Sequence, residues 1–340
     1  MSIPYRTQQG IKRFFIVLLV ITVVAVIAFA CWMLWLHRFV VYDRDSGALL
    51  KFELEPVKSG ELAVPPQGES EISIYYNEGE NAVQTSKELT KLSGYYVDAT
   101  TVRQDPRAVM EQLKTLPAGT PVMIDVKNIN GYFFYSSSVS ELIHTDMDVA
   151  AMDELIEYLD KSGLYAIARV PAFRDREYGR RYTYNGLPVP SGGYLWMDSA
   201  GCYWLNPTRD AVIERLSNVA TELRLLGFDE VMFTHFEFPA TDKIRFDGDK
   251  PTALADAAAK LVQFCATDSF AVSFSTDGTW TPPEGRSRVY IADANPLDVE
   301  LYAENLGMKD NPINLVFLTN LHDTRFEEYS VLRSITTREQ

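Results

Sequence analysis

The chain has 340 residues, of which 46% are hydrophobic, and its formal net charge is −14. This length allows one large domain with extensions, and the acidic excess argues against a nucleic-acid partner, which would need a basic surface. With only four histidines and three cysteines, the chain has no Cys/His cluster with zinc-ligand spacing, so we expect no metal and no organic cofactor.

The N-terminal part of the chain predicts a membrane anchor. The run from Phe14 to Leu36 contains no charged residue, and a helix of that length crosses a hydrocarbon core of about 30 Å. Because Arg6, Lys12 and Arg13 precede the run, the positive-inside rule places residues 1–13 in the cytoplasm. We therefore expect a single-pass protein of the cell membrane, with everything after residue 36 extracellular.

Two other interpretations of the apolar run stay open. A cleaved signal peptide ends in small residues, and Ala28-Phe29-Ala30 fits that pattern, although the apolar run continues to Leu36. A lipoprotein signal ending at Cys31 is the second interpretation, although Ala28 stands where such signals usually carry Leu. The unbroken length of the run favours the uncleaved anchor at residues 14–36.

Residues 37–92 predict a stalk or linker with some β-structure, and residues 93–340 predict an α/β domain. Strands are expected at residues 94–99, 121–127, 165–170, 230–238, 271–275, 289–292 and 313–318. Helices are expected between them and at the end of the chain, at residues 106–116, 148–162, 208–226, 251–265, 297–306 and 325–335. Strands that are apolar throughout indicate a parallel sheet covered on both faces. The pattern therefore predicts a (β/α)₈ TIM-type barrel, with an open doubly wound sheet as the alternative, although no glycine-rich phosphate loop supports it.

Polar residues stand at the ends of the expected strands, where the active site of a parallel barrel is built. They are Asp98, Asp125, Lys127, Arg169, Thr234, His235, Glu237, Asp277 and Asp293. For any one of them, the start of a polar loop is the simpler explanation. Asp125 and Arg169 are stronger candidates because each lies inside an apolar run, and a buried charge requires a partner. We expect Asp125 to pair with Arg169 or Lys127, or to bind substrate hydroxyl groups.

Aromatic residues crowd the polar excursion that follows the third expected strand. They are Tyr182, Tyr184, Tyr194, Trp196, Tyr203 and Trp204. These rings can stack on sugars or pack the excursion onto the barrel, and both interpretations stay open. Cys202 and Cys265 are expected to be separate thiols, because no disulfide spacing pattern is present.

Four motifs follow one another along the expected barrel. They are VMIDVK at residues 122–127, AIARVPAFRD at 166–175, WMDSAGCYWLNP at 196–207 and GFDEVMFTHFEFP at 227–239. Together they resemble a family of glycoside hydrolase-like (β/α)₈ barrels that is related to the amylases and often secreted. The resemblance implies the barrel fold, glycoside hydrolysis, and a polysaccharide or cell-wall glycan as partner. It also leads us to expect substrate contacts from Lys127, Arg169, Trp196, Asp198, Thr234 and His235.

The fourth motif departs from the family at the position that matters most for hydrolysis. Thr234 stands where the family carries the Asp thought to be its nucleophile, and Glu237 replaces an Arg. A threonine hydroxyl cannot supply the second carboxylate that glycoside hydrolysis usually needs. Glu237 is three residues further on, so on a regular strand it would face the other way. It can replace the missing carboxylate only if the strand ends before it.

Two functions from different classes therefore compete. The first is a membrane-anchored extracellular glycoside hydrolase with a rearranged site, whose candidate catalytic residues are Glu237, Asp277 and Asp125. The second is a catalytically silent ectodomain that binds saccharides or serves as a scaffold. A purely structural ectodomain is a third interpretation.

Overall fold

The computed structural model describes residues 40–43, 47–50 and 89–335. No helix in these ranges is long and apolar enough to cross a bilayer, and the anchor predicted at residues 14–36 lies outside them. The described residues fall into two units. In the first, β1 (Val40–Asp43) and β2 (Gly47–Leu50) pair as an antiparallel hairpin, within the range predicted to be a stalk.

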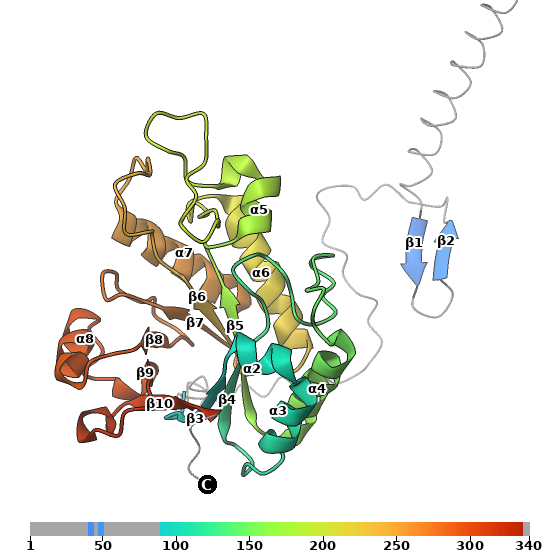
Figure 1. Cartoon of the computed structure of the whole chain (residues 1–340), viewed down its shortest axis with the longest axis vertical. Helices are drawn as coiled ribbons and strands as arrows, with labels where there is room; N and C mark the ends of the chain where they lie inside the picture. Colours follow the sequence, from blue (N-terminus) through green and yellow to red (C-terminus); the bar gives the residue numbers. More distant parts are fainter. Residues whose placement is uncertain (1–39, 44–46, 51–88, 336–340) are drawn as a thin grey trace, which may run out of the picture. The chain divides into compact units, whose positions relative to one another are not determined.

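The second unit is a closed barrel of eight parallel strands (Figure 1). The strands are β3 (Ser93–Val97), β4 (Pro121–Asp125), β5 (Tyr165–Pro171), β6 (Glu230–Thr234), β7 (Ala271–Ser275), β8 (Val289–Ala292), β9 (Leu315–Leu318) and β10 (Ser330–Ser334). Each strand pairs with its neighbour in chain order, and β10 closes the ring against β3. All seven predicted strands are present, so the predicted barrel is confirmed in outline.

Helices cover much of the outside of the barrel. They are α2 (Ala99–Gln104), α3 (Pro106–Leu113), α4 (Val149–Ser162), α5 (Arg176–Arg181), α6 (Asp210–Leu225), α7 (Lys250–Cys265) and α8 (Val299–Asn305). Their ends follow local chemistry. Asp148 accepts a hydrogen bond from the Ala151 amide at the start of α4, and Gly163, with φ 69°, ends that helix. Among the described residues no helix joins β7 to β8, and only the 3₁₀ turn η5 (Thr324–Phe326) joins β9 to β10, so the barrel is less regular than predicted.

The predicted helix at residues 325–335 is wrong, because this segment contains η5 and the eighth strand. The strands β3 and β9 would otherwise leave two rows of backbone groups without partners. Pairing with β10 satisfies both rows, as the parallel register of Val331 with Ser93 and with Phe317 shows. The need to close the ring therefore outweighs the local pattern of the segment.

Side chains of the strands divide between two apolar layers. Val122, Ile124 and other outward-facing residues pack against the helices, whereas Met123, Ile167 and Met232 belong to a second cluster that fills the barrel. Because side chains alternate along a strand, the residues two positions after these inner ones, at the C-terminal ends of the strands, also face inward. This alternation directs Asp125, Arg169 and Thr234 towards the mouth of the barrel.

A buried ion pair closes the opposite, N-terminal end of the barrel. Glu230 on β6 pairs with Arg288, and both side chains are 0% exposed. The carboxylate of Glu230 also accepts hydrogen bonds from the hydroxyls of Tyr290 at 2.7 Å and Tyr165 at 2.9 Å. Arg288 donates in turn to the carbonyl oxygen of Thr90 at 2.8 Å. These bonds join β5, β6, β8 and the start of the domain at one point.

Candidate active site at the mouth of the barrel

Asp125 and Arg169 form an ion pair across neighbouring strands at the mouth. Asp125 lies opposite Arg169 in the register of β4 and β5, and both carboxylate oxygens accept from the guanidinium, one of them from Nη2 at 2.7 Å. The Ala99 amide donates a third hydrogen bond at 2.7 Å. Burial alone would lower the pKa of Arg169, but the hydrogen bonds and charge of Asp125 outweigh it and raise that pKa. Of the two partners left open for Asp125, the structure selects Arg169.

Lys127 has a different partner, which the sequence did not suggest. Its ammonium lies 2.6 Å from an oxygen of Asp175, and both side chains are almost fully buried. Asp175 also caps the start of α5 by accepting from the Tyr178 amide at 2.9 Å. Burial lowers the pKa of Lys127, although the charge of Asp175 opposes this effect. Lys127 thus secures α5 beside the mouth.

Arg174 links two further predicted site residues. Its Nε lies 2.7 Å from Oδ2 of Asp198, which also accepts from the indole of Trp204 at 3.1 Å. Its Nη1 lies 3.3 Å from Nε2 of His235. A guanidinium only donates, so Nε2 must accept and the neutral ring carries its proton on Nδ1. Within the described part of the chain, Nδ1 is buried and has no partner.

We expect His235 to stay neutral across the physiological range. Burial, with the nearby charges of Arg174 and Arg169, lowers its pKa to about 4. The stability that depends on this neutral ring is present above the ordinary His value and is lost as the pH falls towards 4. NMR titration of the imidazole protons should give a midpoint near 4 for His235. A midpoint near 6.5 for His235 would contradict this environment.

Glu237 lies beyond the end of β6, so the alternation of side chains along a strand does not fix the direction of its side chain. The strand ends at Thr234, and His235 adopts the left-handed conformation, with φ 51°. Phe236 then packs into an aromatic cluster, with ring centroids 4.5 Å from Phe274 and 4.6 Å from Phe173. The condition for Glu237 to serve in place of the missing carboxylate is therefore met, and the buried ring of Phe236 fixes the turn that carries it.

Glu237 and Asp277 interact through their charges. Burial and the charge of Asp277 raise the pKa of Glu237, and the charge of Arg174 opposes them. Among the described residues, Glu237 has no hydrogen bond or ion pair. Asp277 is exposed and accepts hydrogen bonds from the amide and hydroxyl of Thr279, at 3.0 and 2.6 Å. One carboxyl group with a raised pKa therefore lies within electrostatic reach of a second carboxylate.

The remaining polar strand ends have simpler roles. Asp98 caps α2 by accepting from the Thr101 amide at 2.8 Å, and Asp293 is exposed in a left-handed turn after β8. Thr234 is half-buried at the end of β6. Arg174 and Asp175 were not predicted as site residues. Both stand at the end of the second motif, which was the signal available for them.

The aromatic residues of the excursion divide into two groups. Trp196 and Trp204 pack with Leu187 and Ile244 in a small apolar cluster, so these two rings have a packing role. Tyr184 and Tyr194 are 65% and 80% exposed and line a surface hollow of about 520 Å³. Cys202 and Cys265 are both free thiols, so the prediction of separate cysteines is confirmed. No group of His, Cys, Asp and Glu in the described ranges has the arrangement of a metal site.

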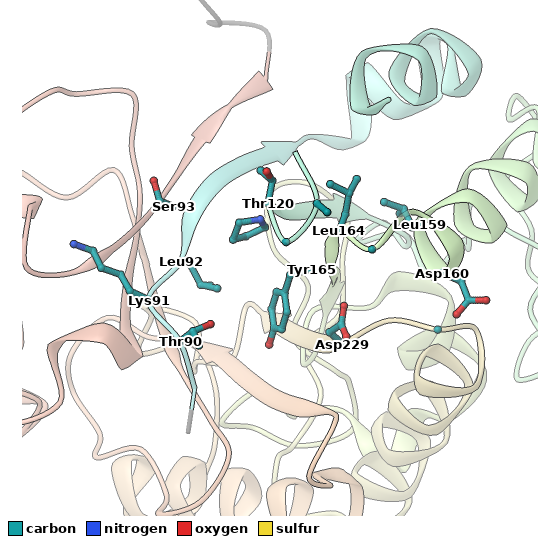
Figure 2. A pocket seen from close by; sticks show the side chains of 15 residues that line it. Thr90, Lys91, Leu92, Ser93, Thr120, Leu159, Asp160, Leu164, Tyr165 and Asp229 are labelled. Carbon is teal, nitrogen blue, oxygen red and sulfur yellow. The ribbon is translucent and has the colours of Figure 1, made fainter. Parts of the chain in front are cut away.

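A separate hollow of about 720 Å³ opens at the N-terminal end of the barrel. Figure 2 shows the side chains of Thr90, Tyr165 and Asp229 around it. Active sites of parallel barrels form at the C-terminal ends of the strands, and none of the mouth residues lines this hollow. It is therefore not the candidate active site.

Comparison with known families decides what kind of barrel this is. The model of a family described as "Putative glycosyl hydrolase domain" matches residues 94–273, more than half of the chain. The chain belongs to this family. The match includes all four motifs, the Asp125–Arg169 pair and Thr234. It ends before Asp277.

Three solved structures that are similar to this family member share 18% sequence identity or less with it. A hypothetical protein from Ruminiclostridium thermocellum is 18% identical, with 53% of this chain and 96% of that chain covered and a TM-score of 0.45. The glycoside hydrolase domain of PelA from Pseudomonas aeruginosa is 12% identical, with 72% and 94% covered and a TM-score of 0.45. A glycoside hydrolase family 20 β-N-acetylglucosaminidase is 12% identical, with a TM-score of 0.47, and this chain covers 52% of it. No curated protein matches the sequence.

Proposed function

We propose that the mouth of the barrel binds a glycan and hydrolyses its glycosidic bonds, with Glu237 as general acid and Asp277 as the second carboxylate. One observation carries the proposal: β6 ends at Thr234, and the turn after it brings Glu237 into the electrostatic field of Asp277. Glycoside hydrolysis uses two such groups, one protonated and one ionised. Membership of a glycosyl hydrolase family supports the reaction class.

The roles of the two carboxyl groups follow from their surroundings. Glu237 has a raised pKa, so it can hold the proton that the departing glycosidic oxygen needs. The Asp277 carboxylate then either attacks the anomeric carbon or deprotonates the attacking water, depending on the separation of the two groups. The positive charge of Arg174 would stabilise the negative charge that Glu237 acquires when it gives up its proton.

The Asp125–Arg169 pair is proposed to orient the sugar. Both oxygens of Asp125 already accept hydrogen bonds within the protein, which makes it a poor nucleophile. The Arg169 side chain is 22% exposed, and its remaining N–H groups can donate to substrate hydroxyls. Asp198 and His235 hold Arg174 in place, so their proposed effect on the substrate is indirect.

Placing the family's carboxylate at residue 234 tests whether the rest of the family's site is intact in this chain. Thr234 faces inward at the end of β6, opposite Pro171 in the register with β5, so Thr234→Asp should place a carboxylate at the mouth. We expect hydrolysis of aryl glycosides to increase by about tenfold or more, because a missing catalytic group typically costs 10²–10⁴-fold. Thr234→Asn is the matched control, with nearly the same shape and no charge. An equal effect of both substitutions would contradict a charge-based role.

A silent saccharide-binding barrel is the second candidate, and Thr234 is the observation that favours it. The decisive assay compares glycan binding with turnover for the full-length chain purified in a mild detergent. Release of reducing ends from polysaccharides supports the hydrolase. Binding without any release, over the whole pH range in which the barrel stays folded, identifies the silent barrel.

We further propose that the run from Phe14 to Leu36 anchors the protein in the cell membrane with the barrel outside. Its length, its lack of charge and the preceding Arg6, Lys12 and Arg13 support this orientation. We expect the full-length chain to remain with membranes after extraction with high salt or sodium carbonate. Protease added to intact cells should degrade the barrel. Protection of the barrel until the cells are lysed would overturn the proposed orientation.

A further inference from the structure

A further polar hollow lies on the flank of the barrel, and none of the mouth residues lines it. It has a volume of about 370 Å³ and is formed by the segment after β4, by α5 and by α6. One wall is the serine loop, residues 136–140, which contains four serines. The other walls carry Glu177, Tyr178, Arg181, Tyr182 and Arg215.

Two arginines that face this hollow have no ion-pair partner among the described residues. The guanidinium carbon of Arg215 lies 4.9 Å from the ring centre of Tyr178 and 6.0 Å from that of Phe133. These aromatic contacts stabilise the cation and orient its plane. Arg181 is exposed in the last turn of α5. Two cations without ion-pair partners beside one hollow can receive the negative group of a ligand.

The serine loop is held rigidly by a carboxylate that does not compete for Arg215. Glu222 accepts hydrogen bonds from the hydroxyls of Tyr135, Ser137 and Ser138, each at 2.7 Å. Burial alone would raise the pKa of Glu222, but these hydrogen bonds outweigh it and lower that pKa. The hydroxyl of Ser140 accepts from the Leu142 amide at 3.2 Å and keeps its proton to donate. The wall is therefore fixed before any ligand arrives.

The hollow also contains groups that suit hydroxyls and a sugar ring. Glu177 is bound by Arg180 at 2.6 Å, whereas Glu141 is exposed and its carboxylate has no partner within the described ranges. A free carboxylate accepts hydrogen bonds from hydroxyl groups. The ring of Tyr182, which is 41% exposed, offers a face for stacking. A ligand that satisfies all of these groups combines one negative charge with several hydroxyls and an apolar ring face.

We propose that this hollow binds an acidic sugar residue, whose carboxylate pairs with Arg181 and Arg215 and whose hydroxyls meet Glu141 and the serine loop. A planar carboxylate matches the planar guanidinium group better than a spherical ion does. The choice of a sugar rests on the glycan-directed function proposed above, but the site is separate from the carboxylates of the mouth. It would hold an acidic polysaccharide beside the active site.

The test measures binding of a galacturonic acid trisaccharide and of the neutral galactose trisaccharide to the full-length chain by calorimetry. We expect the acidic trisaccharide to bind at least tenfold more tightly. Arg181→Gln and Arg215→Gln should each weaken that binding by at least tenfold. Arg209→Gln, which removes an exposed arginine at the start of α6, should leave it unchanged. Arg181 is exposed, so its variant stays informative even if the Arg215 variant folds poorly.

Three outcomes would overturn the proposal: equal affinity for the two trisaccharides, unchanged binding in both arginine variants, or inorganic phosphate binding as tightly as the acidic trisaccharide. The same titration is repeated with Glu237→Gln. Unchanged binding of the acidic trisaccharide by that variant is expected, because Glu237 does not line this hollow. If the wild-type chain shows this binding but no hydrolysis, the proposed reaction fails while the flank site stands.

Discussion

Replacing Glu237 with Gln should reduce kcat/KM for glycan hydrolysis by about 10²–10⁴-fold, the range typical for loss of a general acid. Gln retains the shape of the side chain and can still hydrogen-bond, so binding of the glycan should change little. The loss should therefore appear in kcat rather than in KM. Initial rates at several substrate concentrations, together with binding measured by calorimetry, check both parts.

The pH profile gives this prediction a second readout. The pKa of Glu237 is raised above its ordinary value by burial and by the charge of Asp277. Activity that needs the protonated acid should fall as the pH rises through this raised pKa, and Gln should remove that limb of the profile. A carboxyl group with a raised pKa also stabilises the fold only while protonated, so its contribution is lost as pH rises. Glu237→Gln should therefore make the barrel more stable at neutral pH.

A matched control separates these effects from general changes at the mouth. Asp293→Asn also removes one carboxylate from the end of a strand, and Asn tolerates the left-handed conformation found there. We expect this variant to keep its activity. Unimpaired turnover in Glu237→Gln would exclude Glu237 as the acid. Asp277 would then be the next carboxylate to replace.

The second large effect concerns stability. Glu230→Gln should lower the free energy of unfolding by about 3–5 kcal/mol, because it leaves the charge of Arg288 buried without its partner. Both side chains are 0% exposed, so water cannot replace the lost carboxylate. Denaturant unfolding followed by tryptophan fluorescence measures the difference. Glu157→Gln, which breaks an exposed pair with Lys161, should change the free energy of unfolding far less, because water replaces the lost contact.

Removing both charges should restore much of the loss. The double variant Glu230→Leu/Arg288→Met replaces the ion pair with apolar side chains, and such replacements are often neutral or stabilising. Tyr165 and Tyr290 would then lose their shared acceptor, so we expect recovery to be incomplete. If the double variant were less stable than Glu230→Gln, the buried charge would not be the cause of the loss.

Much of the barrel could be predicted from sequence because its signals are local. Apolar runs such as residues 121–125 and 271–275 identify strands by themselves. The eighth strand could not be identified in this way, because residues 330–334 lie in a charged segment with a helix-like pattern. Their conformation is decided by the open edges of β3 and β9, which are distant in the sequence.

The candidate site shows the same division between local and distant causes. The sequence predicted that Asp125 needs a partner but could not choose between Lys127 and Arg169. The choice depends on Asp175, which accepts a hydrogen bond from Lys127. Arg169 is then left as the partner of Asp125. The end of β6 at Thr234 could not be predicted either, because a non-glycine residue such as His235 rarely adopts the left-handed conformation. Without the turn at His235, nothing in the pattern shows that Glu237 leaves the strand.

The position of β10 has a consequence for how the protein is made. Because β3 and β10 come from opposite ends of the domain and pair with each other, the ring cannot close until Ser334 has left the ribosome. Before that moment β3 and β9 expose unpaired edges, the kind of surface through which partly folded chains aggregate. Synthesis of this domain should therefore depend on chaperones that shield strand edges, and loss of only the last ten residues should prevent folding altogether.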